Sequence, residues 1–306
     1  MVLLLIVDFD ADLDPGLGAL GPLGGYFVLR TIVDPAHAPR AGLSTLAQSY
    51  GGTTSDVHGD CVTFRVRKVA RALRAPDART AASVAQLGLA SRLWSAALGC
   101  AARTGRIPDL DPRLLRWDPD ASAPDDLWLT EVRPLPGDAE TVAATVLHAH
   151  LEPLAALLRA RYRIAAGLLW GNAASALTGA ARELDRWAYA NGRPDVAARA
   201  GSLTRRLLTH PLLTGTGTLT GTAFRRRSCC LYYRVPGGGV CGDCCFTRPP
   251  GAPDLGAPDL GAPDLGAPDL GAPDLGAPDL GAPDPSAPDL GAPDLGAPDP
   301  GAPPAP

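Results

Sequence analysis

The sequence predicts a mainly helical body with minor β structure and a C-terminal, cysteine-rich loop that binds metal. Three observations lead to this fold class. Long stretches are rich in Ala, Leu and Arg and poor in aromatic residues, five of the seven cysteines fall between Arg225 and Cys245, and a GAPDL repeat begins at residue 251. We therefore divide the chain into a body (1–222), a cysteine segment (223–248) and a tail (249–306).

Five stretches of the body have the composition and the stop signals of helices. Gly105 and Pro108 end one of them, and Pro194 falls in the first turn of another. Pro153 lies inside a third, which it should kink or divide. The stretches are 61–75, 78–105, 138–163, 165–192 and 194–210.

Strand signals are few. Residues 126–132, DLWLTEV, alternate in polarity and lie between Pro124 and Pro134, which predicts an edge strand. LLLIV at 3–7 and CLYYRV at 230–235 fit two further short strands. Helices are therefore expected to dominate the fold.

Charge and hydropathy exclude several classes of partner. The chain has 28 basic and 32 acidic residues, and the tail supplies ten aspartates, so the rest carries 28 − 22 = +6 with no dense basic stripe for nucleic acid. The N-terminal apolar run is shorter than the roughly 20 residues of a membrane span and lacks the basic start of a secretory signal. We expect a cytoplasmic protein without a membrane span, in which clustered cysteines bind metal or carry redox chemistry.

The tail has no means of burying a core. Pro recurs at every fifth residue and each repeat offers at most one Leu, so an extended, disordered strand is expected. Repeat expansion without a selected role is the favoured interpretation. An acidic tether that docks on a basic partner is the alternative.

The cysteine spacing is C-C-x10-C-x2-C, formed by Cys229, Cys230, Cys241 and Cys244, with Cys245 next to the last. A C-x-x-C turn lets two thiolates converge on one metal. The adjacent pair needs a bent backbone to reach one centre, which a cluster with two irons tolerates better than a single zinc ion. A structural zinc site, a vicinal disulfide and inert thiols are the alternatives.

The segment SCCLYYRVPGGGVCGDC resembles the C-terminal signature of FhuF-type ferric-siderophore reductases. Residues 18–29, 81–99 and 168–185 look like the helical body of actinobacterial members. The resemblance implies a [2Fe-2S] cluster on Cys229, Cys230, Cys241 and Cys244. Cys245 lies outside the pattern, either as a competitor of Cys244 or as an inert neighbour, and Cys244 is preferred.

The resemblance also implies an oxidoreductase of iron homeostasis in the cytosol. Such enzymes act on ferric siderophores of the hydroxamate type, and a ferredoxin or flavodoxin is the expected electron donor. One electron converts tightly held Fe(III) into weakly held Fe(II), so no general base or nucleophile is needed. The alternatives are a non-catalytic metal-binding module and a simple electron carrier.

Several residues outside the ligand set are candidates for supporting roles. Arg225, Arg226 and Arg227 would stabilise the reduced cluster, attract an anionic chelate or dock an acidic donor, or they form a solvated basic run. Asn172, in the middle of a helix, has the chemistry to hydrogen-bond a chelate or a sulfur. Tyr233 is expected to pack against the cysteine loop or to touch the siderophore.

Other motifs carry less weight. The opening LLLIVDFDAD imitates the start of haloacid-dehalogenase-type phosphatases without their later motifs, and it is incomplete as a calcium loop. His148 and His150 should lie on different faces of a helix and form no metal pair. Cys61 and Cys100 are expected to be buried, inert thiols.

Overall fold

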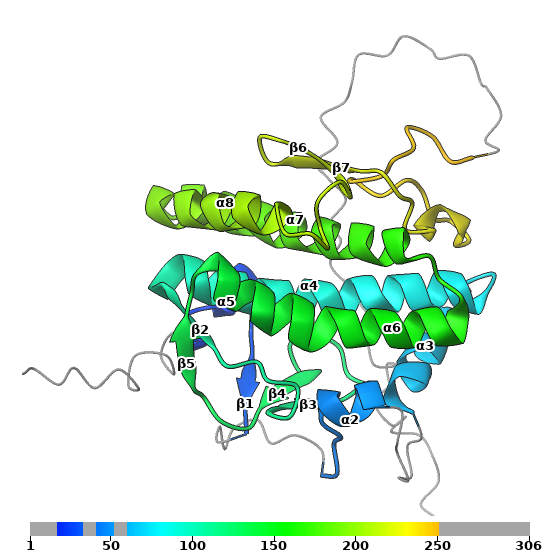
Figure 1. The fold of residues 1–306 in the computed structure, drawn as a ribbon, viewed down its shortest axis with the longest axis horizontal. Helices are drawn as coiled ribbons and strands as arrows, with labels where there is room; N and C mark the ends of the chain where they lie inside the picture. Colours follow the sequence, from blue (N-terminus) through cyan, green and yellow to red (C-terminus); the bar gives the residue numbers. More distant parts are fainter. Residues whose placement is uncertain (1–16, 33–40, 52–59, 251–306) are drawn as a thin grey trace, which may run out of the picture. The chain divides into compact units, whose positions relative to one another are not determined.

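Helices form most of the described chain, which confirms the predicted fold class (Figure 1). The structure is a computed structural model that describes residues 17–32, 41–51 and 60–250, and these belong to one unit, Met1–Pro273. The predicted strand at residues 3–7, the acidic motif after it and the repeat tail lie outside the described residues.

All five predicted helical stretches are helical, with ends within a few residues of those expected. The helices are η1 (Gly21–Leu23), α2 (Leu46–Gly51), α3 (Cys61–Ala72), α4 (Ala78–Thr104), α5 (Ala139–Ala143), the π-helix η2 (Ala144–Leu151), α6 (Glu152–Tyr162), α7 (Ala166–Ala190), α8 (Pro194–Leu208) and η3 (Tyr232–Arg234). The strands are β1 (Arg30–Thr31), β2 (Arg106–Pro108), β3 (Leu115–Trp117), β4 (Leu127–Leu129), β5 (Pro134–Pro136), β6 (Gly217–Thr220) and β7 (Ala223–Arg226).

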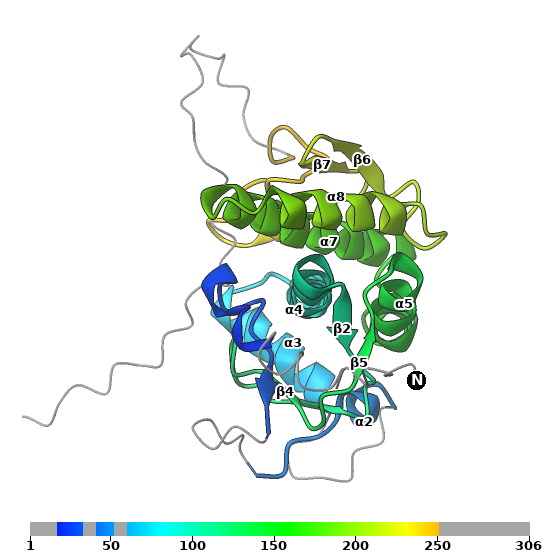
Figure 2. The same ribbon diagram turned by 90° about the vertical axis from the view of Figure 1, so that its left-hand side faces the viewer.

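Helix α4 is the central element of the body. The Asp77 carboxylate caps its first turn by accepting from the Thr80 N–H at 2.7 Å, and Gly105 ends it with a left-handed φ of 75°. Most of its residues are buried, because α7 and α8 pack on one side of it and α3 packs on another (Figure 2). Many of its buried residues are alanines, whose small side chains suit close packing of helices.

The stretch from Ala139 to Tyr162 is helical throughout but changes type twice. It widens into η2 and returns to α geometry at α6, where Pro153 is the second residue. Proline has no N–H to donate to the preceding turn, so the division predicted at Pro153 is confirmed. By length and composition alone this stretch would also cross a membrane, and 56% of its most apolar window is buried inside the body.

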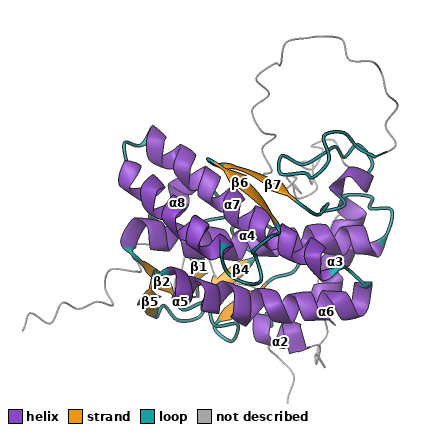
Figure 3. Ribbon diagram, turned by 45° about the horizontal axis from the view of Figure 1, so that its top comes forward, coloured by secondary structure: helices purple, strands orange, loops and turns teal. Residues whose placement is uncertain are grey.

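The small sheet corrects one strand prediction. Its strand order is β1-β4-β3, with β4 parallel to β1 and antiparallel to β3. Figure 3 shows how little strand, in orange, accompanies the purple helices. The prediction of an edge strand at 126–132 is therefore wrong in position. The strand β4 is central, because it is hydrogen-bonded to β1 on one side and to β3 on the other. All three β4 residues are buried, so the alternation of the sequence does not mark a solvent face there.

The hairpin of β6 and β7 connects the body to the cysteine segment. Its strands are antiparallel, and Gly221 makes the turn with φ 61°. The boundary predicted between residues 222 and 223 falls at this turn. β7 contacts α7, and the chain then continues along the N-terminal half of α7, where the cysteines follow (Figure 1).

Candidate metal centre

The geometry of strand β7 places the side chains of the three successive arginines in different environments. Side chains alternate along a strand, so Arg226 faces α7 and is 2% exposed, whereas Arg225 and Arg227 are exposed. The interpretation of all three as one solvated or docking run is therefore wrong for Arg226. The exposed pair remains available at the surface, and Arg225 Nη2 donates to the Cys245 carbonyl at 3.2 Å.

A sharp reversal follows the adjacent cysteines, and the strand predicted at 230–235 is wrong. Leu231 has a left-handed φ of 70°, and the next three residues form the single turn η3. The following glycines let the chain fold closely, because a Cβ on Gly238 would lie 2.5 Å from the Tyr232 carbonyl oxygen. The reversal supplies the bent backbone that an adjacent pair of ligands needs.

Five thiols meet in two groups. Cys230 Sγ lies 3.6 Å from Cys241 Sγ, and the Sγ atoms of Cys229, Cys244 and Cys245 lie within 4.8 Å of one another. Two thiolates on one tetrahedral metal, each at about 2.3 Å, stand about 3.8 Å apart. The first group has this separation, and the second offers two or three thiols at comparable range.

Backbone N–H groups point at the sulfurs, as in sites that stabilise thiolates. Leu231 N–H donates to Cys229 Sγ at 3.3 Å, and Phe246 N–H donates to Cys244 Sγ at 3.4 Å. The C-x-x-C turn closes through a bond of 2.9 Å from the Cys244 N–H to the Cys241 carbonyl. Such N–H donors stabilise anionic sulfur in a metal-bound centre.

Asp243, inside the C-x-x-C turn, anchors the loop to α7. Its buried carboxylate accepts from Ser175 Oγ at 2.6 Å and from Arg182 Nη1 at 3.2 Å, and its carbonyl accepts from the Arg226 N–H at 2.9 Å. Sequence reasoning missed Asp243 and Arg182. The available signal was a charged residue between two cysteines, which needs a partner if the loop is packed.

A second set of polar contacts runs from α4 through α7 to β7. Asn172 is fully buried, donating from Nδ2 to the Ser83 carbonyl at 3.0 Å and accepting from Arg226 Nη2 at Oδ1. Ser83 Oγ in turn donates to the Cys230 carbonyl at 2.7 Å. The oxygen and the nitrogen of the Asn172 amide are thus both hydrogen-bonded within the protein. Asn172 is linked to the cysteines indirectly, through Ser83 and Arg226.

Gly171 leaves the space in which the segment docks. A Cβ at Gly171 would lie 2.2 Å from Ser228 Oγ, which donates to the Gly167 carbonyl at 2.9 Å. The glycine in α7 therefore serves a close approach of the backbone. The other small residues of α7 are buried because α4 and α8 also pack against this helix.

The thiols differ in their affinity for a proton. Burial raises the pKa of Cys229 to about 12 and raises the pKa of Cys245. In the close pair, the hydrogen bond from Cys241 lowers the pKa of Cys230, with the charge of Arg226 and the Tyr232 N–H acting in the same direction.

The remaining candidate residues are an aromatic side chain of the cysteine loop, two cysteines of the body and two histidines. Tyr233 is partly exposed and meets Phe246 edge to face, with ring centroids 5.8 Å apart. Cys61 and Cys100 are buried in the core, as predicted. His150 is fully buried whereas His148 is exposed, so the two do not form a metal pair.

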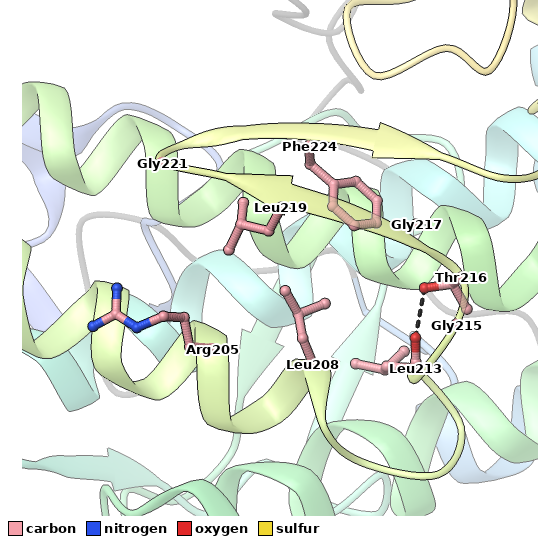
Figure 4. Close-up of a pocket in the computed structure, with 9 residues that line it drawn as sticks. All are labelled: Arg205, Leu208, Leu213, Gly215, Thr216, Gly217, Leu219, Gly221 and Phe224. Atoms are coloured by element: carbon pink, nitrogen blue, oxygen red, sulfur yellow. Dashed lines mark hydrogen bonds between the residues drawn. The ribbon is translucent and has the colours of Figure 1, made fainter.

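Two cavities flank the β6–β7 hairpin, and neither is lined by a cysteine. The larger, of about 350 Å³, lies between the end of α8 and the hairpin, with Leu208, Leu213 and Phe224 in its wall (Figure 4). The second, of about 280 Å³, includes Arg182 from the loop anchor. Among the cysteines, Cys229, Cys241 and Cys245 are partly exposed, so the thiol groups reach the molecular surface.

Comparison with protein families identifies the cysteine segment. Residues 226–246 match the family model of the FhuF 2Fe-2S C-terminal domain. The match covers this segment alone, and the likeness of residues 18–29, 81–99 and 168–185 to actinobacterial members stays a prediction. No curated protein matches the chain. The matched domain binds a [2Fe-2S] cluster, and the two groups of thiols fit two irons that each take two thiolates.

Proposed function

We propose that this protein is a ferric-siderophore reductase that removes iron from a hydroxamate-type chelate in the cytosol. The observation that carries the proposal is the match of residues 226–246 to the FhuF 2Fe-2S domain. When bound, a [2Fe-2S] cluster supplies one electron at a time. Cys229, Cys230, Cys241 and Cys244 would hold it, and Cys245 stands within reach of the Cys229 side.

The chemistry of the substrate does not require a deep catalytic pocket. Hydroxamate oxygens are hard, anionic ligands that bind Fe(III) strongly and Fe(II) weakly, so the addition of one electron to Fe(III) releases the metal. The chain has to bring the chelate near a partly exposed thiol group and to hold the redox centre rigidly. Cys229, Cys241 and Cys245 provide the exposed edge.

Charge at the same surface supports docking. Arg225 and Arg227 are exposed beside the cysteine loop, and Arg234 lies on the loop itself, paired with Asp77 at 2.8 Å. Exposed cations attract an anionic chelate or an acidic ferredoxin or flavodoxin, and their effect falls as ionic strength rises. We propose these arginines as the docking residues.

A structural zinc module is the rival from another class. The body has a large hydrophobic core of its own, in which the cysteines of the segment take no part. The loop is also held to α7 by Asp243, Ser175 and Arg182. Because these contacts attach the segment, a metal is not required as a staple, which favours a redox role.

The test uses the full chain, purified without oxygen. Metal and acid-labile sulfide are assayed first, and the protein is then reduced, freed of reductant and mixed with a ferric trihydroxamate and a ferrous-specific chelator. We expect one Fe(II) to be trapped for each electron that the protein loses. Cys230→Ser should abolish the reaction, and Cys61→Ala, which removes a distant buried thiol, should preserve it.

Three results would contradict the proposal. Zinc as the only bound metal after anaerobic reconstitution would leave a structural module. Oxidation by a small redox protein but not by the ferric chelate would indicate an electron carrier. Full activity in Cys230→Ser would show that the ligand assignment is wrong.

A further inference from the structure

Arg226 is a buried cation with an incomplete set of partners. Its side chain is 2% exposed, and only Nη2 is used, by Asn172 Oδ1 and by the Leu168 carbonyl at 3.5 Å. Nε and Nη1 are buried and have no hydrogen-bond partner within the described residues. Buried donors without acceptors are uncommon in native proteins and ask for an explanation.

The protein also leaves the charge of Arg226 without a counter-ion. Within the described part of the chain, no carboxylate pairs with its guanidinium. Asp243, whose carbonyl accepts from the Arg226 N–H, already has its carboxylate engaged by Ser175 and Arg182. A buried, unpaired cation is costly, so a site of this kind requires an anion from elsewhere.

The guanidinium lies between α7 and the thiols. A Cβ at Gly171 would be 3.4 Å from Nη2 and 3.6 Å from Nε, which places the group against the α7 backbone. Arg226 is also connected to the cysteine loop, because its N–H donates to the Asp243 carbonyl at 2.9 Å, and Asn172, the partner of Nη2, donates to Ser83, whose Oγ donates to the Cys230 carbonyl. Arg226 is therefore held between α7 and the loop that carries the thiols.

The anion that fits is the cluster itself. Four thiolates and two sulfides outweigh the charge of two irons, so a bound [2Fe-2S] centre is net negative, and reduction adds one more negative charge. A fixed cation in a buried site favours the more negative state, and salt screens it weakly there.

We propose that Arg226 is the buried counter-cation of the cluster, with Nε and Nη1 serving its sulfur ligands, and that it raises the reduction potential of the cluster. Asn172 is the positioning residue that fixes the guanidinium from the far side. This inference concerns the cofactor and not the siderophore, so it can fail or succeed independently of the reductase proposal.

The test is an anaerobic redox titration of the full chain with its cluster, followed by visible absorption. Arg226→Gln should shift the ratio of oxidised to reduced cluster by at least tenfold toward the oxidised form at a fixed potential, which is a midpoint lower by about 59 mV for one electron. The shift should persist in 0.5 M salt, a condition in which the Debye length is roughly 4 Å. Arg227→Gln is the matched control, because it removes the same charge from an exposed neighbour, and it should change the ratio by less than threefold.

Variants that do not bind the cluster also test the proposed role of Arg226. If Arg226→Gln loses the cluster while Arg226→Lys keeps it, the positive charge is required, as proposed. Loss in both variants, with circular dichroism and melting of the metal-free proteins unchanged, supports direct contact with the cluster. A metal-free Arg226→Gln protein that is already unfolded, or a cluster-bound one that titrates like Arg227→Gln, overturns the proposal.

Discussion

Two buried arginines, one in the body and one at the cysteine segment, have opposite surroundings. Arg92 and Arg226 are each 2% exposed. Arg92 Nε donates to the buried Asp126 carboxylate at 2.8 Å, and its other nitrogens reach the carbonyls of Gly25, Tyr26, Val28 and Pro124. Arg226 has no carboxylate partner in the described chain and keeps two unpaired nitrogens.

This difference in surroundings distinguishes a structural arginine from one that is available to a ligand. The Arg92 site is closed, because its charge and its hydrogen bonds are satisfied by the protein. The Arg226 site is open, because no described residue pairs with its charge and two of its nitrogens have no hydrogen-bond partner there. Removal of one partner from a buried ion pair destabilises the fold, whereas a buried charge that has no partner indicates a missing ligand.

The largest effect is expected at the closed site. Arg92→Met leaves the Asp126 carboxylate buried without a partner, which should lower the free energy of unfolding by about 3–5 kcal/mol. Urea denaturation of the metal-free protein measures this loss. Arg113→Met is the control, because Arg113 forms its ion pair with Asp111 at the surface and should leave the midpoint nearly unchanged. Equal stability of Arg92→Met and the parent would remove the contrast on which the comparison depends.

A smaller effect is expected from a second satisfied group of the body. His150 is fully buried, with Nδ1 accepting from the Tyr50 hydroxyl at 2.9 Å and Nε2 donating to the Leu110 carbonyl. Burial lowers the pKa of His150 from its ordinary value of 6.5 to about 4. The unfolded chain therefore binds a proton at a pH where the folded protein does not, and stability is lost as pH falls below 6.5 toward 4.

Between pH 7 and pH 5 this linkage should cost about 2 kcal/mol of the free energy of unfolding. Urea denaturation at the two pH values measures it, and His150→Gln should reduce the difference by that amount. His148→Gln, two residues away on the exposed face, should retain the parent difference. A pH dependence that is identical in the parent and His150→Gln would refute the assignment.

The smallest effect on the metal-free protein is expected at the open site. Arg226→Met removes an unpaired charge and one hydrogen bond to Asn172, and these changes oppose each other. The free energy of unfolding should change by at most about 1 kcal/mol. Denaturation of the metal-free protein beside Arg92→Met gives the direct comparison. A loss as large as that of Arg92→Met would make Arg226 a structural residue like Arg92.

The sequence allowed the helices and the clustering of the cysteines to be predicted, for local reasons. Helix α4 begins at the Asp77 cap and ends at Gly105, and both signals are written in adjacent residues. The close spacing of Cys229 to Cys245 likewise brings the thiols together through one short loop, so neither feature depends on distant parts of the chain.

The errors came from long-range partners. β4 was expected at a sheet edge because prolines flank it, but β1 and β3 pair with both of its sides. CLYYRV was a local error instead, because it has the composition of a strand but reverses at Leu231, which has a left-handed φ, and then forms the single turn η3. The distinct role of Arg226 required knowing that β7 lies on α7, which no local pattern indicates.

The docking of the loop on α7 has a consequence for biosynthesis. Helices α3 to α8 precede Cys229 in the chain, so a ribosome completes the body before it releases the last ligand. Ser83, Asn172 and Ser175 can then stand in place as a prepared platform when the cysteines emerge. Insertion of the cluster would then be a late step that takes place on a folded body. A chain that has not reached this step would be folded and would lack only its cofactor.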